Sequence, residues 1–302
     1  MTILAVEHAT RYTYATSVDM AQHLAYLRPL EDAGQQVESF TLAIEPPPSY
    51  VHEERDCFGN TRIAFTVTAA HRGLAVRSSA RVCVQPPSAL DPAASAPWET
   101  VRARLRFAAG APFEPAAQFV VPSPYVPRLA ALREWAAPSL ASGRPVAVAA
   151  VELMARLHQE FAYKSASTSL DTPLSDVLAS RQGVCQDFAH LMIGALRMHG
   201  LAARYISGYL LTTPVHAVHP GAPMLGADAS HAWLAVWCPR ADGSSAHWLE
   251  FDPTNNVLPG ESHIRLAVGR DYGDVTPLRG VIRGGGAHEL SVQVGTRRLD
   301  SD

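Results

Sequence analysis

Lysine, cysteine and long apolar runs are all scarce in this sequence. Lys164 is the one lysine among 25 basic residues, a bias that GC-rich coding explains and that carries no functional information. Basic and acidic residues number 25 and 28, so neither a nucleic-acid footprint nor a polybasic membrane patch is expected. No apolar stretch approaches the roughly 18 residues of a transmembrane helix, and the N-terminus lacks a signal-peptide core. We therefore expect a cytoplasmic protein with neither nucleic acid nor membrane as a partner.

The four cysteines are Cys57, Cys83, Cys185 and Cys238, and no two of them form a CxxC pair. They make neither a disulfide framework nor a thiolate zinc site, and we expect no metal and no organic cofactor. The rest of the composition is that of a folded protein, with 47% hydrophobic and 18% charged residues. A length of 302 residues suits two domains.

Three regions of the chain differ in pattern. Residues 1–84 alternate between apolar and polar positions and predict an N-terminal β-sandwich-like domain, with strands including His8–Tyr14, Phe40–Ile44 and Leu74–Val84. Residues 85–145 read as a linker rich in Pro, Ala and Ser, followed by short helices. Residues 146–302 are predicted to form the second domain, which opens with a helix over Val146–Gln159 and closes with C-terminal strands.

Residues 180–254 hold the most informative pattern. Apolar residues recur at helical spacing from Gln186 to His199, and Gly200 is a stop signal, so Cys185 lies in the first turn of a predicted buried helix. Strands are predicted over 201–211, 231–238 and 245–252. Residues 212–230 form a predicted loop whose length is unusual for a compact domain. Such loops are usually functional or disordered, and the place of this one next to His231 points to a substrate rim or lid.

The last two of these strands predict a hairpin, because Pro239 and Asp242-Gly243 mark a turn between them. If residues 239–244 form the turn, Cys238 pairs with Ser245, and the same register places His231 directly opposite Asp252. Cross-strand partners have Cβ atoms about 4.5–5.5 Å apart, which suits an imidazole–carboxylate hydrogen bond. A slip by one residue would put Asp252 on the other face of the sheet.

Cys185, His231 and Asp252 together have the chemistry of a catalytic triad. A helix N-terminus and a neighbouring imidazolium both lower the pKa of a thiol, which favours Cys185 as a thiolate nucleophile. His231 would take the thiol proton and later protonate the leaving amine, while Asp252 would orient the imidazole and stabilise its cation. Such a set acts on an amide or ester through a thioester acyl-enzyme.

Four blocks of the sequence resemble the transglutaminase-like core domain. They are Gly183–His190, Ala203–Tyr209, Ser230–Trp233 and Phe251–Asn255, and the first 84 residues and the tail Val268–Val275 are similar to the bacterial subfamily with its own β-rich N-terminal domain. The resemblance implies an α+β, papain-like core with a nucleophile helix packed on an antiparallel sheet. It also implies the triad Cys185, His231 and Asp252. Because this core serves transamidases, peptidases and amidases, the resemblance does not define the reaction.

Some polar residues near the triad have two interpretations each. The backbone N–H of Cys185 is expected in an oxyanion hole because it lies at a helix start. The candidates for the second donor are Gln182 and Tyr163. The alternative role of Gln182 is that of a solvated turn residue, and the alternative role of Tyr163 is core packing. Trp233 either forms a rim of the substrate site or packs in the core. Asp187 is expected to cap the helix.

The remaining candidates are expected to be structural. His190 lies about 140° around the helix from Cys185, which excludes it as the base. His216 and His219 in the long loop lack a third metal ligand and are expected to be solvated. Turn roles are expected for Asp56, Gly59, Asn60, Asn255, Asn256, Asp271, Tyr272 and Asp274, and packing roles for Cys57, Cys83 and Cys238.

The sequence thus favours a cysteine enzyme that acts on an amide or isopeptide bond of a peptide, protein or small amide. Hydrolysis is favoured over transfer to an amine acceptor. Two alternatives stay open: a catalytically silent module that binds a partner, and an acyltransferase that moves an acyl group from a carrier thioester to an amine. The sequence predicts no oligomeric state.

Overall fold

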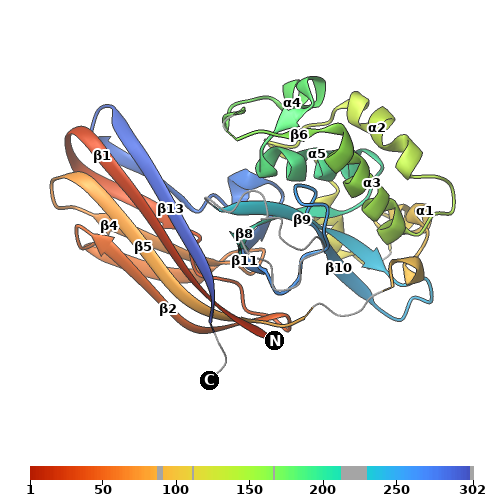
Figure 1. The fold of residues 1–302 in the computed structure, drawn as a ribbon, viewed down its shortest axis with the longest axis horizontal. Helices are drawn as coiled ribbons and strands as arrows, with labels where there is room; N and C mark the ends of the chain where they lie inside the picture. The colour runs from red at the N-terminus through yellow and green to blue at the C-terminus, as the bar shows by residue number, and fades with distance from the viewer. Residues whose placement is uncertain (87–90, 111, 166, 212–229, 300–302) are drawn as a thin grey trace.

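A curled β-sheet lies beside a body of helices packed on a second sheet in the computed structural model, which describes residues 1–86, 91–110, 112–165, 167–211 and 230–299 (Figure 1). The curled sheet is built on one long strand, β1 (Thr2–Ala25). Residues 3–13 of β1 lie between β5 (His71–Val84) and β13 (His288–Leu299), and residues 21–25 lie between β4 (Thr61–Val67) and β12 (Leu278–Gly284). β2 (Gln35–Glu45) flanks β5, and β3 (Tyr50–Arg55) flanks β4.

The sheet curls where the pairing of β1 is interrupted, near residues 15–17. There the backbone amides of Ala15 and Thr16 donate to Ala287 and Gly285, and Gly284, Gly285 and Gly286 all adopt positive φ. Glycine takes this backbone conformation without a steric penalty. The two halves of the sheet consequently share one apolar core, which includes Tyr14, Phe65 and Leu74. The expected sandwich-like domain is therefore a single curled sheet.

The C-terminal strands β12 and β13 belong to this curled sheet. The sequence predicts them as part of the 146–302 domain, and the structure corrects that assignment, because both strands pair with β1. A strand has two hydrogen-bonding edges, and β4 and β5 occupy only one edge of β1. β12 and β13 occupy the other edge. The domain bounds at residues 84 and 146 stay predictions.

The second body packs helices on a four-stranded antiparallel sheet of order β10-β9-β8-β11, as the resemblance implies. Its central helix, α5 (Cys185–Met198), packs against β8 and β9 and is buried along most of its length. The helix predicted over 146–159 is α3. The sheet strands are β8 (Ala203–Leu210), β9 (His231–Pro239), β10 (Ala246–Phe251) and β11 (His263–Gly269), and the other helices and short strands are η1 (Pro92–Ala94), α1 (Trp98–Arg104), η2 (Pro115–Phe119), α2 (Ala130–Ala136), η3 (Ala137–Ser139), α3 (Val146–Glu160), β6 (Ala162–Tyr163), α4 (Leu174–Ser180), β7 (Gln182–Gly183) and η4 (Tyr272–Asp274).

The two bodies meet through one face of β1. The even-numbered residues Leu4, Val6, His8 and Thr10 are buried, as the alternation of the sequence predicts. Leu4 and Val6 share an apolar cluster with residues of β8 and β11, and His8 Nδ1 lies 2.9 Å from the Tyr209 hydroxyl of β8. Period-two alternation thus selects the face that carries the interface.

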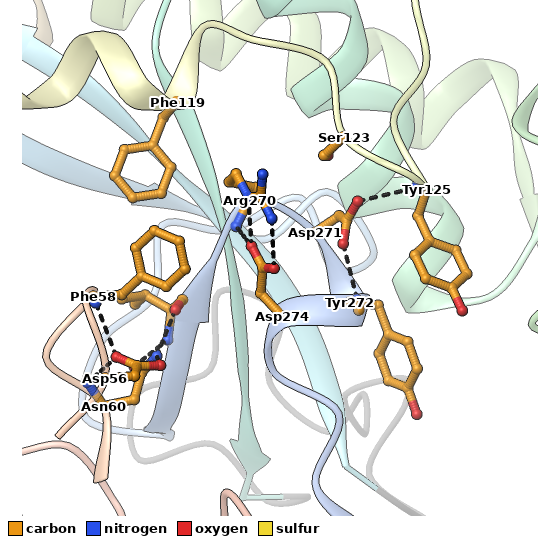
Figure 2. Close-up of polar contacts among 12 residues, drawn as sticks. Asp56, Phe58, Asn60, Phe119, Ser123, Tyr125, Arg270, Asp271, Tyr272 and Asp274 are labelled. Atoms are coloured by element: carbon orange, nitrogen blue, oxygen red, sulfur yellow. Dashed lines mark hydrogen bonds and ion pairs between the residues drawn. The ribbon is translucent and has the colours of Figure 1, made fainter. Parts of the chain in front are cut away.

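Asn60 makes a second link between the two bodies. Its Nδ2 donates to the Val268 carbonyl at 2.8 Å, and its Oδ1 accepts from the Val268 N–H at 2.7 Å, so its side chain pairs with β11 as a strand residue would. Asp56 holds the turn by accepting from the Phe58 and Asn60 amides, as Figure 2 shows. The neighbouring Cys57 is exposed, so its expected packing role is wrong, whereas Cys83 and Cys238 are buried as expected.

The segment after β11 forms the expected structural turn and binds α5. Asp271 accepts from the amides of Gly273 and Tyr125 at 2.9 and 2.8 Å, and Asp274 pairs with Arg270 (Figure 2). Arg197 of α5 donates to the Arg270 carbonyl at 2.6 Å.

Among the described residues, no helix is both long and apolar enough to cross a membrane.

Substitution of Asn60 by alanine is expected to destabilise the protein by about 2–3 kcal/mol, because the N–H and the C=O of Val268 would both lose their side-chain partner in a buried place. Urea unfolding followed by circular dichroism measures this change. Gln36→Ala, at an exposed position of β2, is the control and should stay within about 0.5 kcal/mol of wild type. Equal stability of the two variants would show that Asn60 does not hold the interface.

Candidate active site

The candidate catalytic residues converge at one end of the four-stranded sheet. His231 begins β9, and Asp252 directly follows β10. Since neighbouring strands are antiparallel, the start of β9, the end of β10 and the start of β11 lie at the same end. α5 begins at Cys185 and packs on this sheet, close enough to His231 that Cys185 contributes to raising the His231 pKa. The residues predicted as nucleophile, base and acid are therefore brought together.

The hairpin register differs from the predicted one by two residues. Pro239 pairs with Ala246, and Leu234 pairs with Phe251, so continuation of the register puts Asp252 beside Trp233 rather than His231. The cause is a tight turn: Gly243, at φ 74°, donates to the Arg240 carbonyl, and pairing continues to Arg240 and Ser245. A shift by two keeps the same face. The predicted hydrogen bond is confirmed, with His231 Nε2 at 2.9 Å from Asp252 Oδ2.

Asp252 is fully buried and accepts five hydrogen bonds. Oδ1 accepts from the backbone amides of Thr254 and Asn255 at 3.0 and 3.3 Å. Oδ2 accepts from His231, from the Asn255 side chain at 2.8 Å and from His263 Nε2 at 3.2 Å. Burial alone would raise the pKa of this carboxyl, but the charge of His231 and the hydrogen bonds from both histidines hold it well below its ordinary value. Asp252 is therefore an anion at neutral pH.

His231 is held as an imidazolium by its surroundings. Burial lowers its pKa, but the charge of Asp252, its hydrogen bond and the contact with Cys185 outweigh burial and raise the pKa to about 10. Because Nε2 donates to Asp252, Nδ1 is the nitrogen that remains for the thiol. Among the described residues, Nδ1 is buried without a hydrogen-bond partner, and the charge of Cys185 acts on the same ring. This arrangement suits proton exchange between Cys185 and His231.

Cys185 is half-buried at the first position of α5. Asp187 reaches back to accept the Val184 N–H at 2.9 Å and the Thr168 hydroxyl at 2.6 Å, which confirms the expected cap. Gly183 leaves the space that this carboxylate needs, since a Cβ atom there would lie 2.8 Å from Asp187 Cβ. The amides of the first helical turn point out of the helix N-terminus without helical acceptors. The thiol and these N–H groups thus share one end of α5.

The two candidates for the second oxyanion donor lie just before α5. β6 and β7 pair in parallel, with Tyr163 opposite Gly183 and Ala162 opposite Gln182. The Gln182 side chain is exposed. The half-buried Tyr163 ring lies edge-on to Phe188, with 6.4 Å between ring centroids. Their oxyanion role stays a prediction.

Trp233 is fully buried beneath the candidate triad. Its ring stacks on His231 at 5.8 Å between centroids, and its indole N–H donates to Glu250 at 2.8 Å. Gly208, opposite His231, makes room for the indole, because a Cβ atom there would lie 2.3 Å from the ring. Of the two interpretations of Trp233, its burial favours packing.

The histidines outside the triad behave differently. His190 is buried, stacks on Tyr125 and accepts the Tyr272 N–H at Nε2, 3.2 Å away. Burial and the nearby Arg197 lower its pKa to about 3, so its exclusion as the base is confirmed. His216 and His219 lie outside the described residues.

His231, Asp252 and His263 form a group whose ligand atoms lie within 4.8 Å of one another, close enough to contact one metal ion. The five hydrogen bonds to Asp252 already account for this geometry, because they occupy both carboxylate oxygens and require a proton on each Nε2. A histidine nitrogen binds a metal only without its proton. The observed donor set therefore fits a hydrogen-bonded cluster. His263 is the member of this cluster that the sequence did not single out, and Asn255, expected in a turn, also contributes its side chain.

Comparison with known proteins agrees with this geometry. Residues 4–83 match the bacterial transglutaminase-like N-terminal region, and residues 133–253 match the transglutaminase-like superfamily. The chain belongs to the transglutaminase-like superfamily. An uncharacterized protein of Mycobacterium tuberculosis is 40% identical over 281 residues, covering 92% of this chain and 86% of that protein. One from Mycobacterium leprae is 32% identical, covering 98% and 99%.

Two other proteins that this chain resembles carry functional descriptions. A protein-glutamine gamma-glutamyltransferase of Pseudomonas aeruginosa is 31% identical over 123 residues, which are 39% of this chain and 17% of that protein. A solved structure from Cytophaga hutchinsonii, described as a candidate cysteine protease, is 20% identical with a TM-score of 0.73 and covers 100% of this chain and 92% of that chain. The latter likeness shows the same fold.

At pH 7 we expect iodoacetamide to alkylate Cys185 about tenfold faster than Cys57, although Cys57 is the more exposed thiol. A free thiol is only a few per cent thiolate at this pH, whereas Cys185 lies at a helix N-terminus beside a protonated His231. Peptide mass spectrometry after timed quenching gives the rates, with the buried Cys83 and Cys238 as slow references. Faster labelling of Cys57 would exclude an activated Cys185.

The His231–Asp252 pair should also make stability depend on pH. Since the pKa of His231 rises on folding from about 6.5 to about 10, its contribution is complete below pH 6.5 and is lost as the pH rises toward 10. The stability difference between wild type and Asp252→Asn should therefore shrink between pH 6 and pH 10 in urea unfolding. The exposed Asp19→Asn variant is the control and should show no such trend. A constant difference for Asp252→Asn would contradict the ion pair.

Proposed function

We propose that this protein is a cysteine enzyme that cleaves amide or isopeptide bonds through a thioester intermediate. The observation that carries the proposal is one buried histidine that bonds Asp252 and lies near Cys185. His231 bonds Asp252 through Nε2 and leaves Nδ1 to Cys185 at the start of α5. This is the arrangement that a thiolate–imidazolium nucleophile requires.

The first half-reaction forms the thioester. The Cys185 thiolate attacks the amide carbonyl, and the oxyanion that develops is stabilised by amide N–H groups at the helix start. The C–N bond then breaks, and Nδ1 of the His231 imidazolium gives its proton to the leaving amine. Asp252 keeps the imidazole in the tautomer that directs Nδ1 toward the sulfur.

The second half-reaction releases the acyl group. A water molecule gives its proton to Nδ1 of the neutral His231 and attacks the thioester carbonyl, and the C–S bond breaks to return the thiolate and the imidazolium. We favour hydrolysis because water needs no binding site of its own. Transfer to an amine follows the same steps with the amine in place of water, and the similarity to a gamma-glutamyltransferase supports it as the second candidate.

The expected substrate is a peptide, a protein or a small amide, with a glutamine side-chain amide as the first compound to test. Ammonia release from a blocked glutamine dipeptide, with and without a primary amine acceptor, measures both outcomes. Ammonia release without incorporation of the amine indicates hydrolysis. Equal ammonia release with stoichiometric incorporation of the amine indicates transfer.

The triad is expected to behave as a unit in these assays. Cys185→Ala should lower turnover to background, and His231→Ala should cost nearly as much, roughly 10⁴-fold or more. Asp252→Asn should cost less, on the order of 10²–10⁴-fold, because the histidine remains. The Cys185→Ala/His231→Ala double variant should be no worse than Cys185→Ala.

Cys57→Ala is the matched control for Cys185→Ala, because it removes an exposed thiol from the turn that Asp56 and Asn60 form, and it should keep full turnover. Circular dichroism checks the folding of each variant. Wild-type turnover by folded Cys185→Ala protein would exclude covalent cysteine catalysis.

A further inference from the structure

A second histidine shares the carboxylate of Asp252. His263 Nε2 lies 3.2 Å from Asp252 Oδ2, the same oxygen that His231 Nε2 contacts at 2.9 Å, and the two ring centroids are 6.3 Å apart. We infer that His263 is a positioning residue of the candidate triad, which holds Asp252 and weakens it as the acceptor for His231. The inference rests on the proposed function, because it concerns how the same base is tuned.

The topology explains why His263 reaches Asp252. β10 and β11 are the two edge strands of the sheet, and the chain between them crosses the sheet end where β9 begins. Asp252 starts this crossing segment and His263 follows it as the first residue of β11. The carboxylate therefore lies between a histidine of the inner strand β9 and a histidine of the edge strand β11.

The protons of this cluster are fixed by its hydrogen bonds. Because the anionic carboxylate can only accept, His263 and His231 both donate from Nε2. Nδ1 of His263 then carries no proton in the neutral ring, and it has no hydrogen-bond partner among the described residues. His263 thus uses its Nε2–H, as far as the described contacts show, for Asp252 alone.

Two groups of side chains face His263. Asp252, His231 and the edge of the Trp233 ring, 5.2 Å away between centroids, form the triad side. On the other side is a cavity of about 560 Å³ that Arg204, His247, Glu250, Arg265 and Asp32 also line.

The charges of that cavity are engaged with one another. Arg265 bridges Glu250 at 3.3 Å and Asp32 at 2.7 Å. The half-buried Arg204 lies over the Trp248 ring, and the charge of Glu250 acts on it. Among the described residues, the carboxylate that lies within hydrogen-bonding distance of His263 is that of Asp252.

The consequence concerns the strength of the base. A carboxylate that accepts an additional hydrogen bond attracts each of its other donors less strongly. His263 therefore limits how far Asp252 stabilises the His231 imidazolium. An imidazolium that is too stable is a poor acid toward the leaving amine, since acid–base catalysis is most efficient when the pKa of the group lies near the working pH. His263 thereby offsets part of the stabilisation that the buried Asp252 carboxylate gives to the His231 imidazolium.

The test is the titration of the His231 ring, followed by NMR of the histidine ring protons between pH 5 and pH 11 in the full chain. His263→Phe keeps an aromatic ring against Trp233 but removes the donor, and should raise the His231 midpoint by about 0.5–1 pH unit. His263→Gln keeps an N–H donor and should give a midpoint close to wild type. His247→Phe, at the same cavity but exposed on β10, is the matched control.

Coupling through Asp252 gives the decisive readout. In an Asp252→Asn background, His263→Phe should no longer move the His231 midpoint, because the shared anion is absent. A structural effect of the substitution would persist in that background. If His263→Phe does not fold, the wild-type spectrum still decides: the Nε2–H signal of His263 should be protected from exchange and should lose this protection in Asp252→Asn.

Two results would overturn the inference: an unchanged or lowered His231 midpoint in folded His263→Phe, or an equal shift with and without Asp252. Neither depends on turnover. Iodoacetamide labelling of Cys185 in wild type tests the proposed function separately. A Cys185 that reacts like Cys57 would therefore refute the proposed enzyme while leaving the role of His263 to be decided by the titration.

Discussion

The buried carboxylate of Asp252 is the interaction on which the arrangement of the site depends. An ionised carboxylate out of contact with water is costly unless hydrogen bonds and a counter-charge compensate it. Here the donors come from the turn after β10, the Asn255 side chain, the start of β9 and the start of β11. These donors can reach one carboxylate only if β9 and β11 begin, and β10 ends, at the same end of the sheet. The sheet order and the crossing between β10 and β11 meet that requirement, and His231 is oriented as a result.

The N-terminal sheet contributes to the same constraint through β11. Ile264 and Leu266 of β11 share an apolar cluster with Leu4 and Val6 of β1, and Val268 pairs with the Asn60 side chain. His263 is the first residue of this strand and contacts Asp252. Docking of the curled sheet therefore holds one wall of the carboxylate cluster in place. This gives the N-terminal region a structural role in the site without a catalytic residue of its own.

Local signals predicted much of this arrangement, and long-range pairing explains where prediction was wrong. The apolar spacing of α5, the helix start at Cys185 and the cap by Asp187 depend on residues within a few positions of one another, and all are confirmed. The hairpin register was wrong by two residues because Pro239 stays within β9 and Gly243 allows a tighter turn. β12 and β13 pair with the edge of β1 that β4 and β5 leave open. No local sequence pattern reveals this pairing. His263 contacts Asp252, 11 positions earlier in the chain, and lies near His231, 32 positions earlier, so no local pattern links it to the site.

The two nitrogens of His231 lie on different sides of one ring. Nε2 bonds the Asp252 carboxylate, whereas Nδ1 has no hydrogen-bond partner among the described residues. Asp252 engages Nε2 from within the protein, which leaves Nδ1 for the nearby, half-buried Cys185 in the proposed reaction. In that reaction, the groups that would activate the thiol are independent of the acceptor. Water and an amine would meet the same base, and only their access to the acyl group would distinguish them. The same candidate triad is therefore compatible with both hydrolysis and transfer. The specificity of this member must then be sought in the surfaces around Cys185 rather than in the triad.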